Sequence, residues 1–322
     1  MSYQPIRTLA QEVKTNIAKV IVGKEDVIDQ LLIGLIVSGH VLLEDVPGTG
    51  KTMLAKSFSK SLSLDFKRVQ FTPDLLPSDL SGIHFYDQKQ HDFVFRPGPL
   101  FTNLLLADEI NRATPRTQSS LLECMEERQV SIDGETKRLD RPFMVIATQN
   151  PVEHQGTFPL PEAQLDRFLF KIKMGYPTNE EGLSLLKRFK SADPLAELQP
   201  VAGPAEIEAA QRAFSSVGIH DDVLLYLLQL VERTRVREDV AIGVSPRGSQ
   251  ALLRAAQVHA ILKGREYVTP DDVKAMAKPV MSHRLSLRGM ARGRQGEAER
   301  IVDEILRQAE VPAEAGITVR TG

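Results

Sequence analysis

The apolar positions of this 322-residue chain change their spacing near residue 175. Before that point, short apolar runs alternate with segments in which apolar residues recur every three or four positions, and after it only the helical spacing remains. Apolar runs bounded by turn or polar residues are typical of parallel strands buried on both faces. The pattern therefore predicts an α/β domain with a parallel sheet, followed by an α-helical domain. The predicted strands are residues 40–44, 66–71, 104–107 and 143–148.

Two polar stretches that contain proline indicate where the parts join. Residues 174–182 mark the end of the α/β domain, and residues 191–204 are interpreted as a connecting loop. The last residues carry no periodic pattern, so we expect a flexible tail there. The predicted divisions are an α/β domain with an N-terminal helix and hairpin inserts over 1–176, a linker and connecting segment over 177–204, an α-helical domain over 205–312 and a tail over 313–322.

Composition and charge narrow the class of protein. With 42% hydrophobic and 25% charged residues the chain is globular, and its net charge of -2 provides no overall attraction to nucleic acid. The single cysteine, Cys124, has no partner for an intramolecular disulfide, and no basic and then apolar leader is recognisable, so we expect a cytoplasmic protein. The longest nearly uncharged stretch, residues 31–43, is shorter than the ~20 residues that cross a bilayer, which predicts no membrane span.

A glycine-rich loop lies between a predicted strand and a predicted helix. The strand of residues 40–44 leads into Pro47-Gly48-Thr49-Gly50-Lys51-Thr52, and a helical pattern that begins at Met53 follows. In this order the loop N–H groups can surround phosphates, Lys51 can reach the β and γ phosphates and the Thr52 hydroxyl can ligate Mg²⁺. Taken alone, the loop is also compatible with an ordinary tight turn. The full motif has glycine at position 45, where this chain has Asp45.

A second element follows at the end of the strand of residues 104–107. Asp108 and Glu109 terminate the apolar run "LLLA", as expected of a strand beside the phosphate loop. There Asp108 can hold Mg²⁺ through water, and Glu109 can orient or deprotonate the attacking water. An acidic pair at the end of a strand is common by itself, but both elements in this order favour a nucleotide site.

Three further residues are candidates for contact with the nucleotide. Asn150 ends a strand that could lie between the other two and present an amide to the γ-phosphate and the water. Arg167 is a candidate arginine finger, and the alternative is an internal ion pair with Asp166. Arg247 falls in the first turn of a helix that Ser245 caps, where a cation opposes the helix dipole, so we expect a contact with phosphate or a solvated side chain. The remaining candidates for the finger are Arg112 and Arg116.

Together these motifs resemble those of AAA+ ATPases. The Walker A residues 48–52, the Walker B residues 104–109, sensor 1 at Asn150, "LDRF" at 165–168 and "SPR" at 245–247 carry the resemblance. More narrowly, the segments at residues 21–52, 71–82, 95–130 and 156–170 closely resemble the MoxR family, and the resemblance extends over residues 15–285.

The resemblance implies a P-loop NTPase core with a parallel sheet and an α-helical lid. It implies ATP and Mg²⁺ as cofactors, Val22 and Gly23 against the adenine, and a homo-oligomeric ring, usually of six subunits, with Arg167 acting on the nucleotide of a neighbour. The predicted nucleotide-binding residues are Val22, Gly23, Pro47, Gly48, Thr49, Gly50, Lys51, Thr52, Met53 and Arg247, the metal-binding residues are Thr52 and Asp108, and the catalytic residues are Glu109, Asn150 and Arg167.

One hairpin is predicted within the family's insert in the second core helix, here residues 75–101, and a second is predicted later in the chain. Aromatic residues flank a polar tip at residues 83–95, and Asp133-Gly134 is a strong turn signal within residues 130–139. The resemblance implies that such hairpins project toward the pore or the face of the ring, where they contact clients. Ordinary edge hairpins are an equal alternative.

MoxR-like proteins are associated with chaperone-like maturation of protein complexes, often with a partner that contains a von Willebrand factor A (VWA) domain and sometimes with insertion of a metal cofactor. We therefore expect an ATP-driven remodelling factor for protein clients. The alternatives are a DNA-acting motor and a nucleotide-switched scaffold. The basic residues within 282–295, which are His283, Arg284, Arg288, Arg292 and Arg294, have no aromatic residues among them, so they give no clear nucleic-acid surface.

Overall fold

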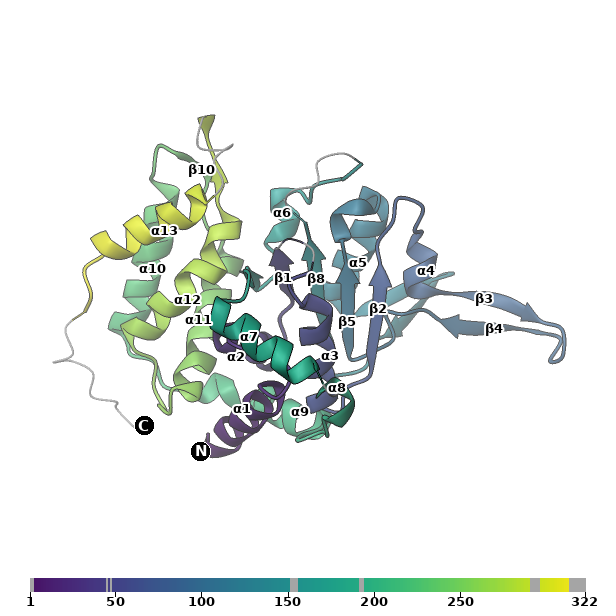
Figure 1. The fold of residues 1–322 in the computed structure, drawn as a ribbon. Coiled ribbons are helices and arrows are strands. Elements are labelled where there is room, and N and C mark those ends of the chain that lie inside the picture. Colours follow the sequence, from purple (N-terminus) through teal and green to yellow (C-terminus); the bar gives the residue numbers. More distant parts are fainter. Residues whose placement is uncertain are drawn as a thin grey trace.

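The computed structural model of the chain consists of a sheet with flanking helices and, beside it, a group of helices (Figure 1). A long hairpin projects from the sheet on the side away from that group (Figure 1). The structure describes residues 3–44, 46, 48–150, 156–190, 194–289 and 296–312.

Five parallel strands form the central sheet, in the order β2-β5-β8-β1-β9. Because β8 lies between β1 and β5, the carboxyl ends of these three strands meet at one edge. The four predicted strands are confirmed to within one residue at each end. The strands are β1 Val41–Glu44, β2 Phe66–Gln70, β5 Leu104–Asp108, β8 Met144–Gln149 and β9 Phe170–Ile172.

The expectation of an apolar, fully buried strand at residues 66–71 is wrong. Strand β2 lies at the edge of the sheet and is half-exposed along its length, so it can carry the polar residues Lys67, Arg68 and Gln70. Strand β9 was not predicted, because three residues are too few to establish an alternation.

Helices cover both faces of the sheet. Alternate residues of the central strands point into separate apolar clusters, with Leu43 and Leu106 in one cluster and Leu42 and Leu105 in the other. Each buried leucine contributes roughly 1.5–3 kcal/mol. The helices of this part are α1 Gln4–Ile17, α2 Glu25–Ile36, α3 Lys51–Ser61, α4 Pro77–Ser81, α5 Pro115–Glu127 and α6 Glu162–Leu165, with a 3-10 turn at Ile110–Arg112.

The second part is helical, as predicted. One of the two apolar clusters continues from β1 and α2 into these helices, so the two parts share a core. The elements are α7 Asn179–Phe189, α8 Pro194–Glu197, α9 Pro204–Ala213, α10 Asp221–Arg235, α11 Pro246–Leu262, α12 Pro270–Met281 and α13 Glu297–Gln308, with 3-10 turns at Phe214–Ser216 and Ser282–Arg284 and a small sheet of β10 Val240–Ile242 and β11 Ser286–Leu287. Among the described residues, no helix combines the length and the apolar character needed to cross a membrane.

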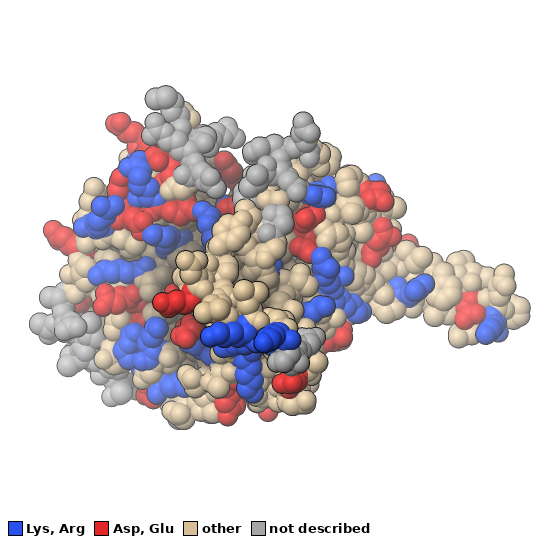
Figure 2. All heavy atoms as spheres, in the orientation of Figure 1, with Lys and Arg blue, Asp and Glu red and all other residues tan. Residues whose placement is uncertain are grey.

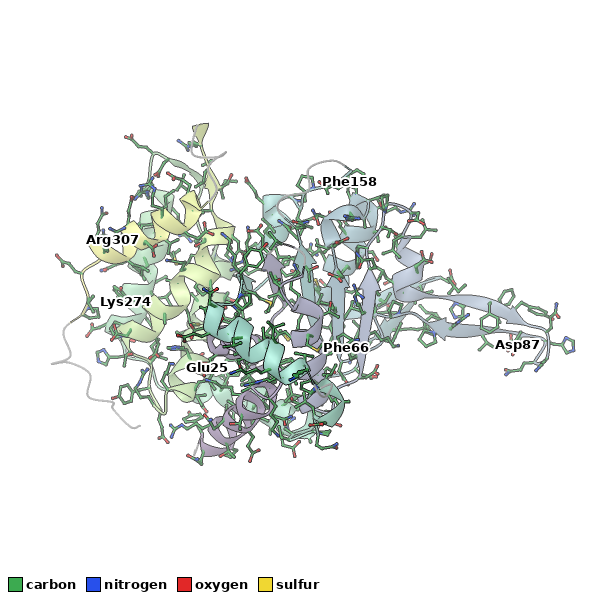
Figure 3. All side chains as sticks on the ribbon, viewed as in Figure 1. Glu25, Phe66, Asp87, Phe158, Lys274 and Arg307 are labelled. Carbon is green, nitrogen blue, oxygen red and sulfur yellow. The ribbon has the colours of Figure 1, made fainter. Side chains whose placement is uncertain are left out.

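Both predicted hairpins are confirmed. Strands β3 Gly82–Asp87 and β4 Asp92–Pro97 form the projecting one, and Asp87, labelled in Figure 3, marks the end of β3 far from the sheet. Strands β6 Gln129–Ile132 and β7 Glu135–Arg138 form the other, and the positive φ angles of Asp133 (50°) and Gly134 (85°) suit a type I′ turn.

Candidate active site

The phosphate loop joins β1 to α3. Gly50 has a φ of 90° and directly precedes α3, whose first residue is Lys51. Gly48 also has a positive φ, 83°, a conformation that costs a residue with a Cβ about 1 kcal/mol or more. The Lys51 amine donates to the carbonyl of Val46 at 3.0 Å. The N-terminus of α3 therefore lies at the carboxyl end of β1 with the Lys51 amine beside it, and this arrangement favours binding of an anion.

A cavity of about 560 Å³ lies over this N-terminus. It brings together residues predicted from three separate motifs, one at each of the strand ends β1, β5 and β8. The predicted residues that line it are Gly48, Gly50, Lys51, Thr52, Met53, Asp108, Glu109 and Asn150, and the unpredicted ones are Lys56, Arg68, Thr148, Gln149 and Leu195.

The predicted residues that do not line this cavity are Val22, Gly23, Thr49, Arg167 and Arg247. Pro47, together with Asp45, lies outside the described residues. Thr49 belongs to the same loop, where its hydroxyl donates to Val46 O at 3.3 Å.

Thr148 on β8 fixes the two acids. Its hydroxyl donates to Asp108 Oδ1 at 2.6 Å and accepts the backbone N–H of Glu109 at 2.8 Å. Thr148 is 1% exposed, so its hydroxyl is held rigidly between the acids. Sequence reasoning missed this residue, although it lies on β8 only two positions before the predicted Asn150.

Polar side chains also hold the Glu109 carboxylate. Gln70 donates to Glu109 Oε2 at 2.7 Å, and Arg112 lies 3.0 Å from the same oxygen. Glu109 adopts a left-handed backbone with a φ of 57°, which is costly for a residue other than glycine and is often found at functional sites. Arg112 therefore lies beside this cavity, in contact with Glu109. Arg116, the other alternative for the arginine finger, is exposed in the first turn of α5.

The oxygen donors in the cavity suit magnesium. Thr52 at the start of α3 and Asp108 at the end of β5 both line it. A hydroxyl and a carboxylate are the hard oxygen ligands that Mg²⁺ prefers, and the remaining positions are commonly filled by water and by phosphate oxygens.

Val22 and Gly23 lie between α1 and α2, next to α7. Gly23 has a φ of 68°, and a Cβ added there would lie 1.7 Å from Glu181 Oε1 of α7. The amine of Lys24 donates to the carbonyl of Tyr176 at 3.3 Å, so the residues before α7 pack against the same loop. A side chain at position 23 would therefore strain the backbone and require Glu181 to move.

Arg167 and Arg247 line a second cavity of about 260 Å³, which shares no residue with the first. Arg167 Nε lies 3.3 Å from Glu126 Oε2, and Arg247 pairs with the other oxygen of the same carboxylate. Glu126, near the end of α5, was not predicted. The cap of α11 is confirmed, because Ser245 Oγ accepts the N–H of Gly248 at 3.1 Å.

An ion pair beside Arg167 ties the helical part to the sheet. Arg284 donates to Asp166 Oδ1 at 2.6 Å, and Ser245 donates to Asp166 Oδ2 at 2.9 Å. Burial lowers the pKa of Arg284, and the charge of Asp166 partly offsets this shift. Of the basic residues at 282–295, His283 and Arg284 are therefore buried rather than solvated, and Arg292 and Arg294 lie outside the described residues.

Comparisons with known proteins agree with the motifs. The model of the ATPase family associated with various cellular activities (AAA) matches residues 40–170, and the AAA lid domain matches residues 232–305. The chain is 48% identical to the protein YeaC of Bacillus subtilis over 98% of each chain. It is 40% identical to "Chaperone MoxR1" of Mycobacterium tuberculosis, over 94% of this chain and 84% of that one.

A solved structure gives the same result for the fold. A crystal structure from Cytophaga hutchinsonii superposes with a TM-score of 0.90 and 38% identity, over 97% of both chains. The parallel sheet and the helical lid are thus those of a P-loop NTPase, and the chain is a nucleotide-binding ATPase. The protein belongs to the MoxR family of AAA+ ATPases.

Proposed function

We propose that the protein hydrolyses Mg-ATP where two copies meet in a ring, which we expect to be a hexamer, and uses the energy to remodel protein complexes. The name of the MoxR1 relative supports a chaperone-like role. The proposed partner is a protein with a VWA domain, and insertion of a metal cofactor is one form that the remodelling could take. The proposed location is the cytoplasm, a reducing compartment in which a free cysteine such as Cys124 is common.

We assign each residue of the first cavity a role in the binding or the hydrolysis of ATP. Lys51 and the N-terminus of α3 bind the phosphates, and Thr52 and Asp108 would hold the metal. Bound Mg²⁺ would neutralise charge on the β- and γ-phosphate oxygens. Glu109 orients or deprotonates the attacking water, and Asn150 presents its amide to the water and the γ-phosphate.

One observation carries the proposal that two copies cooperate. Arg167 and Arg247 share Glu126 in a cavity separate from the phosphate loop of their own subunit. An arginine stabilises the transferring phosphoryl only by direct contact. We therefore assign both arginines to the nucleotide of a neighbouring subunit, with Glu126 as their counterion until the subunits meet.

A mixing experiment tests this assignment. A Lys51→Ala subunit cannot bind ATP but keeps its arginines, and an Arg167→Ala subunit binds ATP but lacks the finger. Each variant alone is expected to lose most ATPase activity, and an equal mixture is expected to recover part of it. Arg212→Ala, a change of an exposed arginine on α9, is the matched control and should keep full activity. A mixture without recovery would contradict catalysis between subunits.

The projecting hairpin supports contact with a protein client. Ile83, Phe85, Tyr86 and Phe93 are 50%, 41%, 51% and 67% exposed, and Figure 2 shows a hairpin with mostly uncharged side chains. Exposed apolar residues of this kind are suited to protein contacts. If the protein remodels such a client, a Glu109→Gln ring is expected to retain a VWA-domain protein in ATP and to release it in ADP. Phe93→Ser is expected to weaken this retention without a loss of ATPase activity. Stimulation of the ATPase by DNA instead would favour a DNA-acting motor.

A further inference from the structure

Both carboxylate oxygens of Asp108 already have donors. Thr148 donates to Oδ1, while Arg68 Nη2 and Nε donate to Oδ2 at 2.6 and 3.1 Å. Two N–H groups on one oxygen use both of its lone pairs. Asp108 Oδ2 therefore has no lone pair left for a further ligand or a metal-bound water unless Arg68 leaves.

Arg68 is the partner that can leave. The Thr148 hydroxyl is buried and also accepts the N–H of Glu109, so its departure would leave a buried polar group unpaired, at a cost of about 1–3 kcal/mol. The Arg68 side chain is 46% exposed on the edge strand β2, where water can replace its contacts. Arg68 is thus the mobile donor and Thr148 the fixed one.

The edge position of β2 explains how Arg68 reaches this carboxylate. Arg68 pairs in register with Leu106, and Gln70 pairs with Asp108, so both β2 side chains lie on one face at the end of the sheet. Arg68 Nη2 also donates to Gln70 Oε1 at 3.1 Å. The guanidinium faces a cavity that Lys51 and Thr52 line as well, so after leaving Asp108 it would remain beside the phosphates.

We propose that Arg68 is a positioning residue that competes with magnesium for Asp108 Oδ2 and so sets the magnesium dependence of nucleotide binding. Without a divalent cation, the guanidinium neutralises a carboxylate whose side chain is only 12% exposed. With the metal present, the same oxygen faces the metal and its water instead. This inference rests on the proposed role of Asp108 in holding the metal.

The test is a binding titration that needs no turnover. A fluorescent ADP analogue is bound to the full chain, and Mg²⁺ is titrated from an EDTA-buffered start for wild type and Arg68→Gln. Loss of the competing ion pair is expected to lower the Mg²⁺ concentration at half-saturation by roughly three- to tenfold, the range for a partly exposed charge-assisted pair. Arg68→Lys keeps the charge but loses the second donor. Its Mg²⁺ concentration at half-saturation is expected to lie between those of wild type and Arg68→Gln.

Lys67→Gln is the matched control. It removes the same charge from the same strand, but Lys67 donates to the carbonyl of Phe101 and does not line the cavity. An unchanged or raised Mg²⁺ requirement in folded Arg68→Gln would overturn the inference, as would complete loss of ADP binding. If Arg68→Gln does not fold, the Mg²⁺ requirement and the ADP binding of Arg68→Lys test the inference by the same criteria. Failure of the proposed ATP site would appear separately, as unchanged nucleotide binding in Lys51→Ala.

Discussion

The Arg284 guanidinium lies 2.6 Å from the Asp166 carboxylate, and its side chain is only 2% exposed. Arg284 also donates to the carbonyls of Phe168 and Leu169 at 2.7 and 3.2 Å. The 3-10 turn after α12 is thereby fixed to the segment that precedes β9. Because Arg167 follows Asp166 directly, the same contact fixes the backbone position of Arg167, the predicted arginine finger.

Asp166→Asn is expected to lower the free energy of unfolding by about 3 kcal/mol, because it leaves a buried guanidinium without a counter-charge. Denaturant unfolding at pH 7 measures this change. Glu208→Gln breaks an exposed pair with Arg212 and is expected to cost less than about 0.5 kcal/mol. Similar costs for the two variants would mean that Asp166 does not hold the helical part in place.

The sequence predicts those parts of the site that local spacing determines. The phosphate loop and the Asp108-Glu109 pair are contiguous motifs, and apolar runs identify the strands that present them. Arg68 and Thr148 acquire their roles only when β2 and β8 pair with β5 on either side, and no local pattern shows this pairing. Glu126 likewise depends on the packing of α11 and the segment before β9 against the end of α5.

His40 makes stability depend on pH. It is 4% exposed, its Nδ1 accepts the N–H of Val145 at 2.9 Å, and its Nε2 lies 2.9 Å from the Met125 carbonyl. Burial lowers the pKa of His40 to about 4. In the unfolded chain, with a pKa of about 6.5, His40 binds a proton as pH falls below that value, while the folded state does not.

Protonation therefore favours the unfolded state between about pH 6.5 and pH 4, and His40 lowers the free energy of unfolding by about 3 kcal/mol over this window. The measurement is denaturant unfolding at pH 7.5 and pH 4.5 for wild type and His40→Gln. The variant is expected to be less stable at pH 7.5 but to lose less stability on acidification. His283, whose pKa burial also lowers, is present in both proteins and cancels in the difference. Equal losses would show that His40 is not responsible.

Glu126→Gln tests the counterion of the two arginines. Loss of the carboxylate frees Arg167 and Arg247 for a neighbour's phosphates, so ATP-dependent assembly is expected at a lower subunit concentration, by roughly fivefold if the pairs contribute about 1 kcal/mol. Sedimentation velocity in ATP measures this shift. Glu123→Gln removes an exposed charge from the same helix and should leave assembly unchanged. Weaker assembly of Glu126→Gln would mean that Glu126 itself forms part of the contact.

Thr148→Val keeps the shape of the side chain but removes the hydroxyl between Asp108 and Glu109. Its two contacts, at 2.6 and 2.8 Å, hold the metal-binding acid and the proposed base at a fixed separation. A small displacement of a base from its water is expected to lower kcat roughly 10- to 100-fold. The KM for ATP should change little, because Lys51 and the loop N–H groups bind the phosphates.

Steady-state kinetics of Thr148→Val and Thr148→Ser separate positioning from folding. The valine variant is also expected to lose about 1–3 kcal/mol of stability, because the Glu109 N–H and one Asp108 oxygen lose a buried partner. Serine restores the hydroxyl and should recover most of kcat. If both variants kept a normal kcat, the two acids would not depend on Thr148. If kcat and KM worsened together in proportion to stability, the residue would act only through the fold.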